Sequence, residues 1–286
     1  MTPRPAAPTE LRLALPRLAL AAQCWGDAGA PPLLALHGWL DNAASFARLA
    51  PRLAARWRVI APDLPGHGRS DHLPPAAGGY AFADYVRAVL EALDALGLAR
   101  CALLGHSMGA GIASLVAAAA PGRVERLWLI EGLGPLGDDG AHTLQRFREA
   151  LAAPADGKPL RRYADVGQAV RARSVAGGLR AELARPIVER GLREAEGGGW
   201  QWRSDPRLTR PSAVRLAEPQ VRALLAGIEA PAALLLARPA TPYLPEAMMR
   251  ERAACVPRIA VAHLDGGHHL HLEHPAAVAR WIGAAA

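Results

Sequence analysis

The sequence has no long hydrophobic run. A helix that crosses a bilayer needs about 20 mainly apolar residues, and Arg, Pro or Asp interrupts every apolar stretch before that length. The stretch 11–22 is apolar enough to imitate a signal peptide, but Pro16 and Arg17 interrupt it and its leucines alternate as they do in strands. We therefore expect no membrane span, a two-stranded entry hairpin and a cytoplasmic protein.

Lysine and cysteine are also scarce. Lys158 is the sole lysine among 33 basic residues, a bias that we attribute to coding. The three cysteines, Cys24, Cys101 and Cys255, lack the spacing of metal ligands, so we interpret them as small core residues in a reducing compartment. The net charge is +7, but arginines and acidic residues are interspersed without a basic run. We therefore expect no nucleic-acid partner.

The chain has instead a regular alternation of short apolar segments and helical ones. Its 286 residues suit one large domain, or a domain with an insertion. Such alternation predicts an α/β fold with a mostly parallel sheet and helices on both faces. We expect strands at 33–36, 57–61, 101–106, 124–131, 232–237 and 259–265, and helices at 45–55, 80–96, 108–120, 244–254 and 275–284.

The alternation breaks between residues 132 and 227. This segment has a helical pattern rich in arginine, with glycine pairs and triplets at 177–178 and 197–199, and no convincing buried strand. We predict an inserted helical cap, or lid, on an α/β core formed by residues 1–131 and 228–286. Such a cap would lie over the carboxyl ends of the strands, where open parallel sheets form their sites.

Ser107 stands where an apolar strand turns abruptly into a helix. Gly105 and Gly109 lie two residues to either side, as a strained backbone that approaches its neighbours closely requires. The serine would project from a tight corner at a helix N-terminus, whose N–H groups favour an anion. This pattern is typical of a nucleophile. The alternative is a strand–helix turn with an ordinary capping serine.

Four motifs occur in order along the chain. They are His37-Gly38-Trp39, the loop 63–70, the pattern Gly-x-Ser-x-Gly at 105–109, and Gly266-Gly267-His268. In this order they resemble the motifs of the α/β-hydrolase superfamily, and the resemblance covers nearly the full length of the chain. Within that superfamily, the segments 37–42, 80–85 and 268–273 look most like the serine hydrolase-like proteins.

The resemblance implies roles for individual residues. Ser107 matches the nucleophile, and His268 matches the base that activates its weakly nucleophilic hydroxyl. The backbone N–H groups of Trp39 and Met108 match the two donors of an oxyanion hole. Trp39 and His106 are candidate substrate-binding residues. Alternatively, the Trp39 ring packs within its own loop and stabilises it, and His106 orders the strand–helix turn at Ser107.

Three further histidines, His269, His271 and His274, compete with His268 on chemistry alone, and such a cluster could bind metal. No paired cysteine or separated set of carboxylates accompanies them, and the last of them leads into a predicted helix. We therefore expect no metal ion and no organic cofactor.

The acid of the triad departs from the family's usual pattern. Most relatives carry an Asp just after the strand that is 232–237 here, but residues 238–245 contain no carboxylate. Glu131 ends the preceding strand on the same edge of the sheet as Ser107, and some relatives keep their acid there. We predict that Glu131 is the acid, with Glu246 and Asp265 as alternatives.

The resemblance implies a serine hydrolase of small, largely apolar carboxylic esters or thioesters, acting through an acyl-Ser107 intermediate. A serine at the elbow argues against haloalkane or epoxide chemistry, which needs a carboxylate nucleophile. Two alternatives stay open: carbon–carbon bond hydrolysis of a diketone, and a ligand-binding protein without catalysis. We expect a small-molecule partner and a monomer or homodimer.

Overall fold

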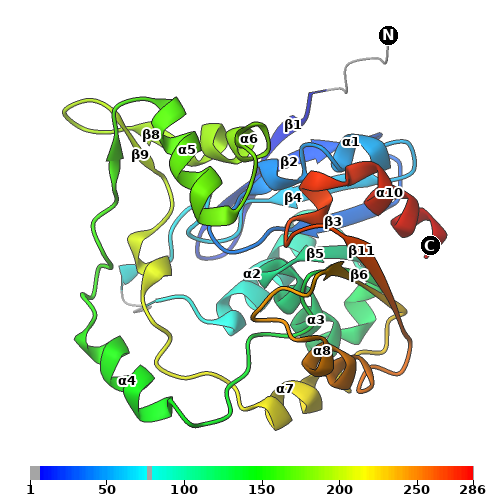
Figure 1. Cartoon of the computed structure of the whole chain (residues 1–286). Helices are drawn as coiled ribbons and strands as arrows, with labels where there is room; N and C mark the ends of the chain where they lie inside the picture. The colour runs from blue at the N-terminus through cyan, green and yellow to red at the C-terminus, as the bar shows by residue number, and fades with distance from the viewer. Residues whose placement is uncertain (1–6, 76–78, 286) are drawn as a thin grey trace.

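A computed structural model describes residues 7–75 and 79–285. Its centre is an eight-stranded sheet in the order β1-β2-β4-β3-β5-β6-β10-β11 (Figure 1). The strands from β4 to β11 in that order are all parallel, whereas β1 and β2 pair antiparallel at one edge as the predicted hairpin. The bounds are β1 Thr9–Ala14, β2 Ala19–Trp25, β3 Pro32–Leu36, β4 Arg58–Pro62, β5 Cys101–His106, β6 Val124–Ile130, β10 Ala232–Arg238 and β11 Ile259–Asp265.

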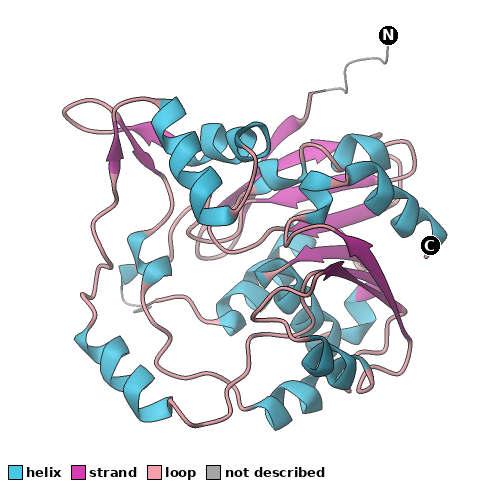
Figure 2. Ribbon diagram, in the orientation of Figure 1, coloured by secondary structure: helices cyan, strands magenta, loops and turns pink. Residues whose placement is uncertain are grey.

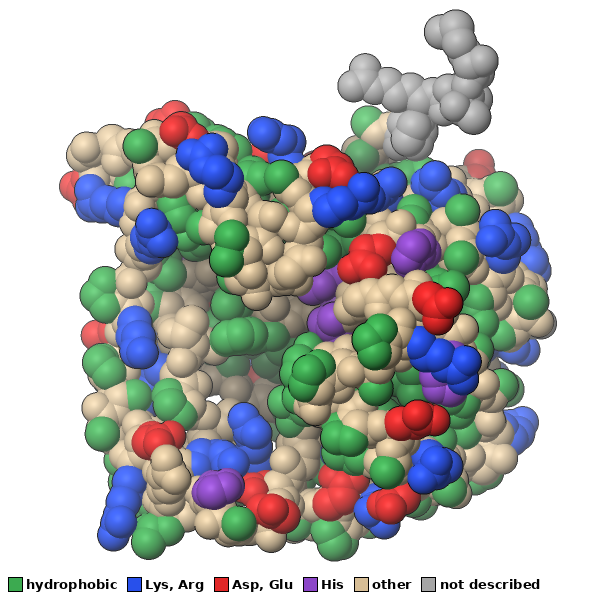
Figure 3. All heavy atoms as spheres, viewed as in Figure 1, with side chains coloured by type: hydrophobic (Ala, Val, Ile, Leu, Met, Phe, Trp, Pro, Cys, Tyr) green, Lys and Arg blue, Asp and Glu red, His purple; other side chains and the backbone are tan. Residues whose placement is uncertain are grey.

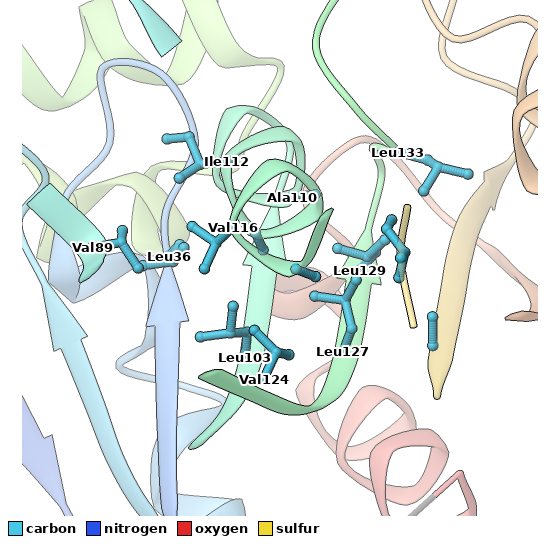
Figure 4. Packing of buried hydrophobic residues seen from close by; sticks show 14 of the residues in the cluster. Leu36, Val89, Leu103, Ala110, Ile112, Val116, Val124, Leu127, Leu129 and Leu133 are labelled. Carbon is cyan, nitrogen blue, oxygen red and sulfur yellow. The ribbon is translucent and has the colours of Figure 1, made fainter. Parts of the chain in front are cut away.

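Helices cover both faces of this sheet, and the side chains of each strand alternate between the two layers (Figure 2). Leu103 packs with α2 and α3, whereas Ala102 and Leu104 pack with η1, α1 and α10. Figure 4 shows Leu103, Leu127 and Leu129 beside α3 residues Ala110 and Val116. The bounds are η1 Ala43–Phe46, α1 Ala50–Leu53, α2 Phe82–Ala95, α3 Met108–Ala119, η3 Pro121–Arg123, α8 Glu246–Ala253, α9 Leu270–Glu273 and α10 Pro275–Ala284.

The predicted α/β fold with its mostly parallel sheet is confirmed. One predicted helix differs, because residues 45–55 form two short turns, η1 and α1. Pro51 has no N–H to donate and fits only the first turn of a helix, so α1 begins beside it instead of continuing from η1. None of the described helices is long and apolar enough to cross a membrane.

Residues 132–227, called the cap segment below, contain helices and a small sheet. The helices are α4 Thr143–Ala152, α5 Val166–Gly177, α6 Ala181–Gly191, η4 Pro206–Thr209 and α7 Glu218–Leu225, and the sheet joins β7 Arg162–Tyr163, β9 Trp200–Trp202 and β8 Leu192–Glu194. The sequence predicted helices alone, because strands of two or three residues are too short to show an alternating pattern. The division into core and cap stays a prediction.

The cap segment leaves an opening in front of the sheet. Figure 3 shows a hollow bordered by this segment, with hydrophobic side chains on its floor and histidines at its edge. The last helix of the cap segment, α7, packs against the core, because Val221 and Leu225 belong to the same apolar cluster as residues of α3. Ser107 follows β5 at the carboxyl end of that strand, the edge at which open parallel sheets form their sites.

Candidate active site

Ser107 forms a strained corner between β5 and α3. Its backbone has φ 53° and ψ −117°, a conformation that residues other than glycine rarely adopt. A Cβ at Gly109 would lie 2.0 Å from the carbonyl oxygen of Leu36, and one at Gly105 would lie 2.5 Å from Cα of Ala110. Glycine is therefore required at both positions, and the half-buried serine projects from the N-terminus of a helix.

The loop after β3 lies directly against this serine. A methyl group added at Gly38 would come within 3.4 Å of the Ser107 Cβ. His37 holds the loop, because its Nδ1 donates to the Gly38 carbonyl at 2.8 Å and its Nε2 accepts from the Leu64 N–H at 2.9 Å. Burial lowers the pKa of His37 to about 4, so the ring is neutral and can accept.

Several backbone N–H groups near Ser107 have no partner within the part of the chain that the structure describes, and two of them concern the predicted oxyanion hole. These two belong to Trp39, in the loop after β3, and to Met108, the first residue of α3. These are the two groups that the sequence predicted as oxyanion-hole donors. Their assignment stays a prediction, because the oxygen that they would bind belongs to the substrate.

Glu131 and His268 lie together at the carboxyl end of the sheet. His268 Nδ1 is 3.0 Å from Glu131 Oε2, although 137 residues separate them. The other carboxylate oxygen accepts from the Ala237 N–H at 2.6 Å, and the Thr241 hydroxyl also donates to the carboxylate. Glu131 is 2% exposed, so its oxygens are satisfied by protein donors.

These contacts fix the charge on Glu131. Burial raises the pKa of Glu131, but hydrogen bonds from His268, Thr241 and the Ala237 N–H outweigh burial and leave the pKa lowered. The carboxylate is therefore ionised at neutral pH and holds the Nδ1–H tautomer of His268. The second ring nitrogen, Nε2, then has no hydrogen-bond partner among the described residues and is available as a base.

The residues that the sequence offered as alternatives to Glu131 and His268 have other surroundings. Asp265 and Glu246 are exposed, and no described hydrogen bond joins either of them to His268. His274 is also exposed, at the N-terminus of α10. His271 is fully buried with Nε2 at 2.7 Å from the Ser45 hydroxyl, and His269 is buried 3.9 Å from Asp41.

His106 contacts the loop that carries His268. Its Nε2 donates to the His268 carbonyl at 2.9 Å, and its ring centroid is 4.9 Å from that of His268 and 4.2 Å from that of His271. Burial lowers the pKa of His271 to about 3 and of His269 to about 4, and it holds the pKa of His106 well below its usual value. These rings are neutral and pack as a layer that supports His268. Among the described residues, no group of three His, Cys, Asp or Glu is placed to hold a metal ion.

Backbone strain is concentrated at this site. Among the described residues other than glycine, three have positive φ: Leu40, Ser107 and Glu131. They belong to the loop after β3, to the elbow and to the residue that contacts His268. Strain of this kind persists where the surrounding structure holds it and is frequent at functional sites.

The structure also adds residues that the sequence did not single out. Thr241 lies in the loop where most relatives carry their acid, and here it donates to Glu131 instead. Arg173 of the cap segment contacts Asp41 in the loop after β3. The sequence showed that residues 238–245 lack a carboxylate. No local pattern signals either contact, because each joins residues more than 100 positions apart.

Comparisons with known proteins agree with this fold. Residues 31–170 match a family model described as alpha/beta hydrolase fold. A serine hydrolase-like protein of Danio rerio is 30% identical over 96% of this chain and 87% of its own length, and one of Dictyostelium discoideum is 31% identical over 92% and 77%.

Two solved structures resemble this chain along almost its whole length. A hypothetical protein of Pseudomonas aeruginosa PAO1 is 42% identical, with a TM-score of 0.88 over 96% of this chain and 98% of its own. A thioesterase domain from the curacin biosynthetic pathway is 26% identical, with a TM-score of 0.84 over 97% of this chain and 99% of its own.

Proposed function

The chain belongs to the α/β-hydrolase family, and from this premise we propose that it is a serine hydrolase of small, largely apolar carboxylic esters or thioesters. The observation that carries the proposal is the 3.0 Å contact between His268 Nδ1 and the buried carboxylate of Glu131. Such a contact leaves Nε2 free to accept a proton from a serine, and the strained Ser107 is the serine of the family's elbow.

The proposed reaction has two halves. Ser107 Oγ attacks the carbonyl carbon of the substrate while His268 Nε2 takes the hydroxyl proton, and Glu131 stabilises the imidazolium through Nδ1. The N–H groups of Trp39 and Met108 stabilise the oxyanion. The proton on Nε2 then passes to the leaving alcohol or thiol, and an acyl-Ser107 ester remains.

A water molecule completes the cycle. His268 Nε2 takes one proton from the water, whose oxygen attacks the acyl carbon and forms a second oxyanion in the same hole. Collapse breaks the bond to Ser107 Oγ, which recovers the proton from His268. The products are a carboxylic acid and the free enzyme, and no other reactant is needed.

Two observations support an acyl ester or thioester as substrate. The thioesterase domain from the curacin pathway is 26% identical along almost the whole chain. The hollow beside the site has a hydrophobic floor (Figure 3), which suits a largely apolar acyl group. We propose that the cap segment covers this group and sets the preference among substrates.

Ser107→Ala tests the proposed function. We expect this variant to fold normally, since the side chain loses one oxygen, and to lose ester and thioester turnover completely. Turnover of 4-nitrophenyl esters and of acyl thioesters is measured beside the circular dichroism spectrum. Turnover at the wild-type rate in Ser107→Ala would contradict the nucleophile assignment. A wild type inactive on all these substrates would contradict the ester or thioester substrate, and a diketone assay would then separate a carbon–carbon bond hydrolase from a ligand-binding protein.

A further inference from the structure

The cap segment contacts the oxyanion loop, defined here as residues 37–42, at several positions. The indole N–H of Trp39 donates to the Leu208 carbonyl in η4 at 3.1 Å. The Asn42 side chain donates to the Ile187 carbonyl in α6 at 2.8 Å. Two different elements of the cap segment thus contact the loop, one at the proposed oxyanion donor and one three residues later.

A third contact joins the loop to α5 by an ion pair. Arg173 Nη2 donates to Asp41 Oδ1 at 2.5 Å, and the two side chains are 13% and 1% exposed. The second oxygen, Oδ2, accepts from the Ser45 hydroxyl at 3.3 Å and lies 3.9 Å from His269 Nε2. Burial raises the pKa of Asp41, but Arg173 outweighs burial and the pKa is lowered, so the pair is charged.

These contacts enclose a strained turn. The Asp41 N–H donates to the Gly38 carbonyl at 3.1 Å, which closes a turn with Trp39 and Leu40 at its centre. Leu40 has φ 58°, and the equivalent position of a type II turn normally carries glycine or asparagine. A leucine keeps this conformation only where its surroundings impose it. The cap contacts on either side impose it together with the core residue His37, which bonds the Gly38 carbonyl.

We propose that Asp41 is a positioning residue: held by Arg173 of the cap segment, it fixes the strained turn so that the Trp39 N–H faces the oxygen that becomes negative when Ser107 attacks. The cap segment would then complete the oxyanion hole as well as cover the substrate. This inference rests on the proposed hydrolase function. The competing explanation is that the ion pair only attaches the cap segment to the core.

The two explanations differ in what happens when both charges are removed. Asp41→Asn leaves a cation without its partner, and Arg173→Gln leaves a buried carboxylate without one, so each single variant is expected to unfold at a lower temperature. The double variant Asp41→Asn/Arg173→Gln carries no unpaired charge and is expected to recover most of the lost thermal stability. Its activity therefore reports on position rather than on folding, even where a single variant folds poorly.

We expect the double variant to lose about 10- to 100-fold in kcat for 4-nitrophenyl acetate, with KM changed about twofold at most, because the oxyanion exists only in the transition state. The effects of the two single variants should not add, since both act through one contact. Arg173→Lys keeps the cation and should retain most of kcat. Glu10→Gln is the matched control, because it also removes a carboxylate paired with a cap arginine, Arg190, while that arginine keeps its second partner.

The outcomes are distinct. A double variant with wild-type kcat would overturn the inference and show that the pair only attaches the cap segment. Loss of kcat in Glu10→Gln equal to that in the double variant would also overturn it, because any cap contact would then suffice. A wild type that hydrolyses no ester would overturn the proposed function, and this inference with it.

Discussion

The core segments and the cap segment are stabilised in different ways. The core buries two large apolar clusters, one on each face of the sheet, and a small third one around β1, β2 and α2. The cap segment has two small clusters of its own, and one of these includes Leu272 from the core. The cap segment carries 16 Lys and Arg against 11 Asp and Glu, and thus +5 of the net charge of +7. Its contacts with residues 39–42 include two hydrogen bonds and one ion pair.

This difference indicates that the core segments position the predicted catalytic residues, and that parts of the cap segment contribute little to their geometry. Ser107, Glu131 and His268 are held by strand ends and by backbone groups of the core, so their geometry should persist when the cap segment changes. In contrast, α4 exposes most of its length, with Leu144 at 61% and Leu151 at 71%. We expect substitutions in the core to affect chemistry or global stability, and substitutions on α4 to affect neither.

After Ser107→Ala, the largest effect is expected for Glu131→Gln. The amide cannot stabilise the imidazolium of His268, and loss of such an orienting carboxylate costs on the order of 10,000-fold in turnover. The variant should fold normally and still be labelled slowly at Ser107 by a reactive fluorophosphonate. Steady-state ester hydrolysis and the labelling rate measure the two effects.

Asp265→Asn and Glu246→Gln are the matched controls for Glu131→Gln, because each removes an exposed carboxylate near the same edge of the sheet. Both should keep turnover close to that of the wild type. If Glu131→Gln were nearly normal and one control inactive, the acid would be the residue changed in that control.

The buried histidines predict that the core loses stability in mild acid. Burial lowers the pKa of His37 and His269 to about 4 and of His67 and His271 to about 3. Between these values and about 6.5 the unfolded chain binds more protons than the folded one, so stability is complete above about pH 6.5 and falls as pH decreases. Each ring contributes at most on the order of 1 kcal/mol per pH unit.

Urea midpoints between pH 8 and 5 measure this loss, in a range above that in which most carboxylates titrate. His271→Gln removes one of the buried rings and should reduce the slope of stability against pH, whereas substitution of the exposed His274 should not. A midpoint that stays constant from pH 7 to pH 5 would contradict the neutral histidine layer.

Two truncations of apolar side chains compare how much the core and the cap segment contribute to stability. Leu103→Ala removes a fully buried side chain beneath α3 and should cost about 2–5 kcal/mol of stability. Phe147→Ala removes a side chain of α4 that is 44% exposed and should cost about 0.5 kcal/mol or less. Denaturant titration compares them, and equal losses would mean that α4 packs as tightly as the core.

Local patterns in the sequence predicted most of the core. Alternating leucines indicated the hairpin of β1 and β2, and the glycines around Ser107 indicated the elbow that the structure contains. The prediction of Glu131 came from the absence of a carboxylate in 238–245, and its hydrogen bond to His268 is consistent with it. The catalytic roles themselves stay predictions.

The cap segment could be predicted only coarsely. Its strands have only two or three residues, too few to show the alternation of apolar and polar residues that identifies a strand. Its contacts with the oxyanion loop pair single polar residues that lie far apart in the sequence. Arg173 is one of 16 basic residues in the segment, and nothing near it in the sequence marks it as the partner of Asp41. Such pairings are decided by tertiary packing.

The most direct test of the account is to trap the acyl group on the protein. The wild type is mixed with an activated ester whose acyl-enzyme hydrolyses slowly, quenched in acid, and analysed by intact mass and peptide mapping. The account predicts one acyl group per chain, on the peptide that contains Ser107, and none in Ser107→Ala. Ester consumption without a trapped acyl group at any time, or an acyl group on another residue, would contradict it.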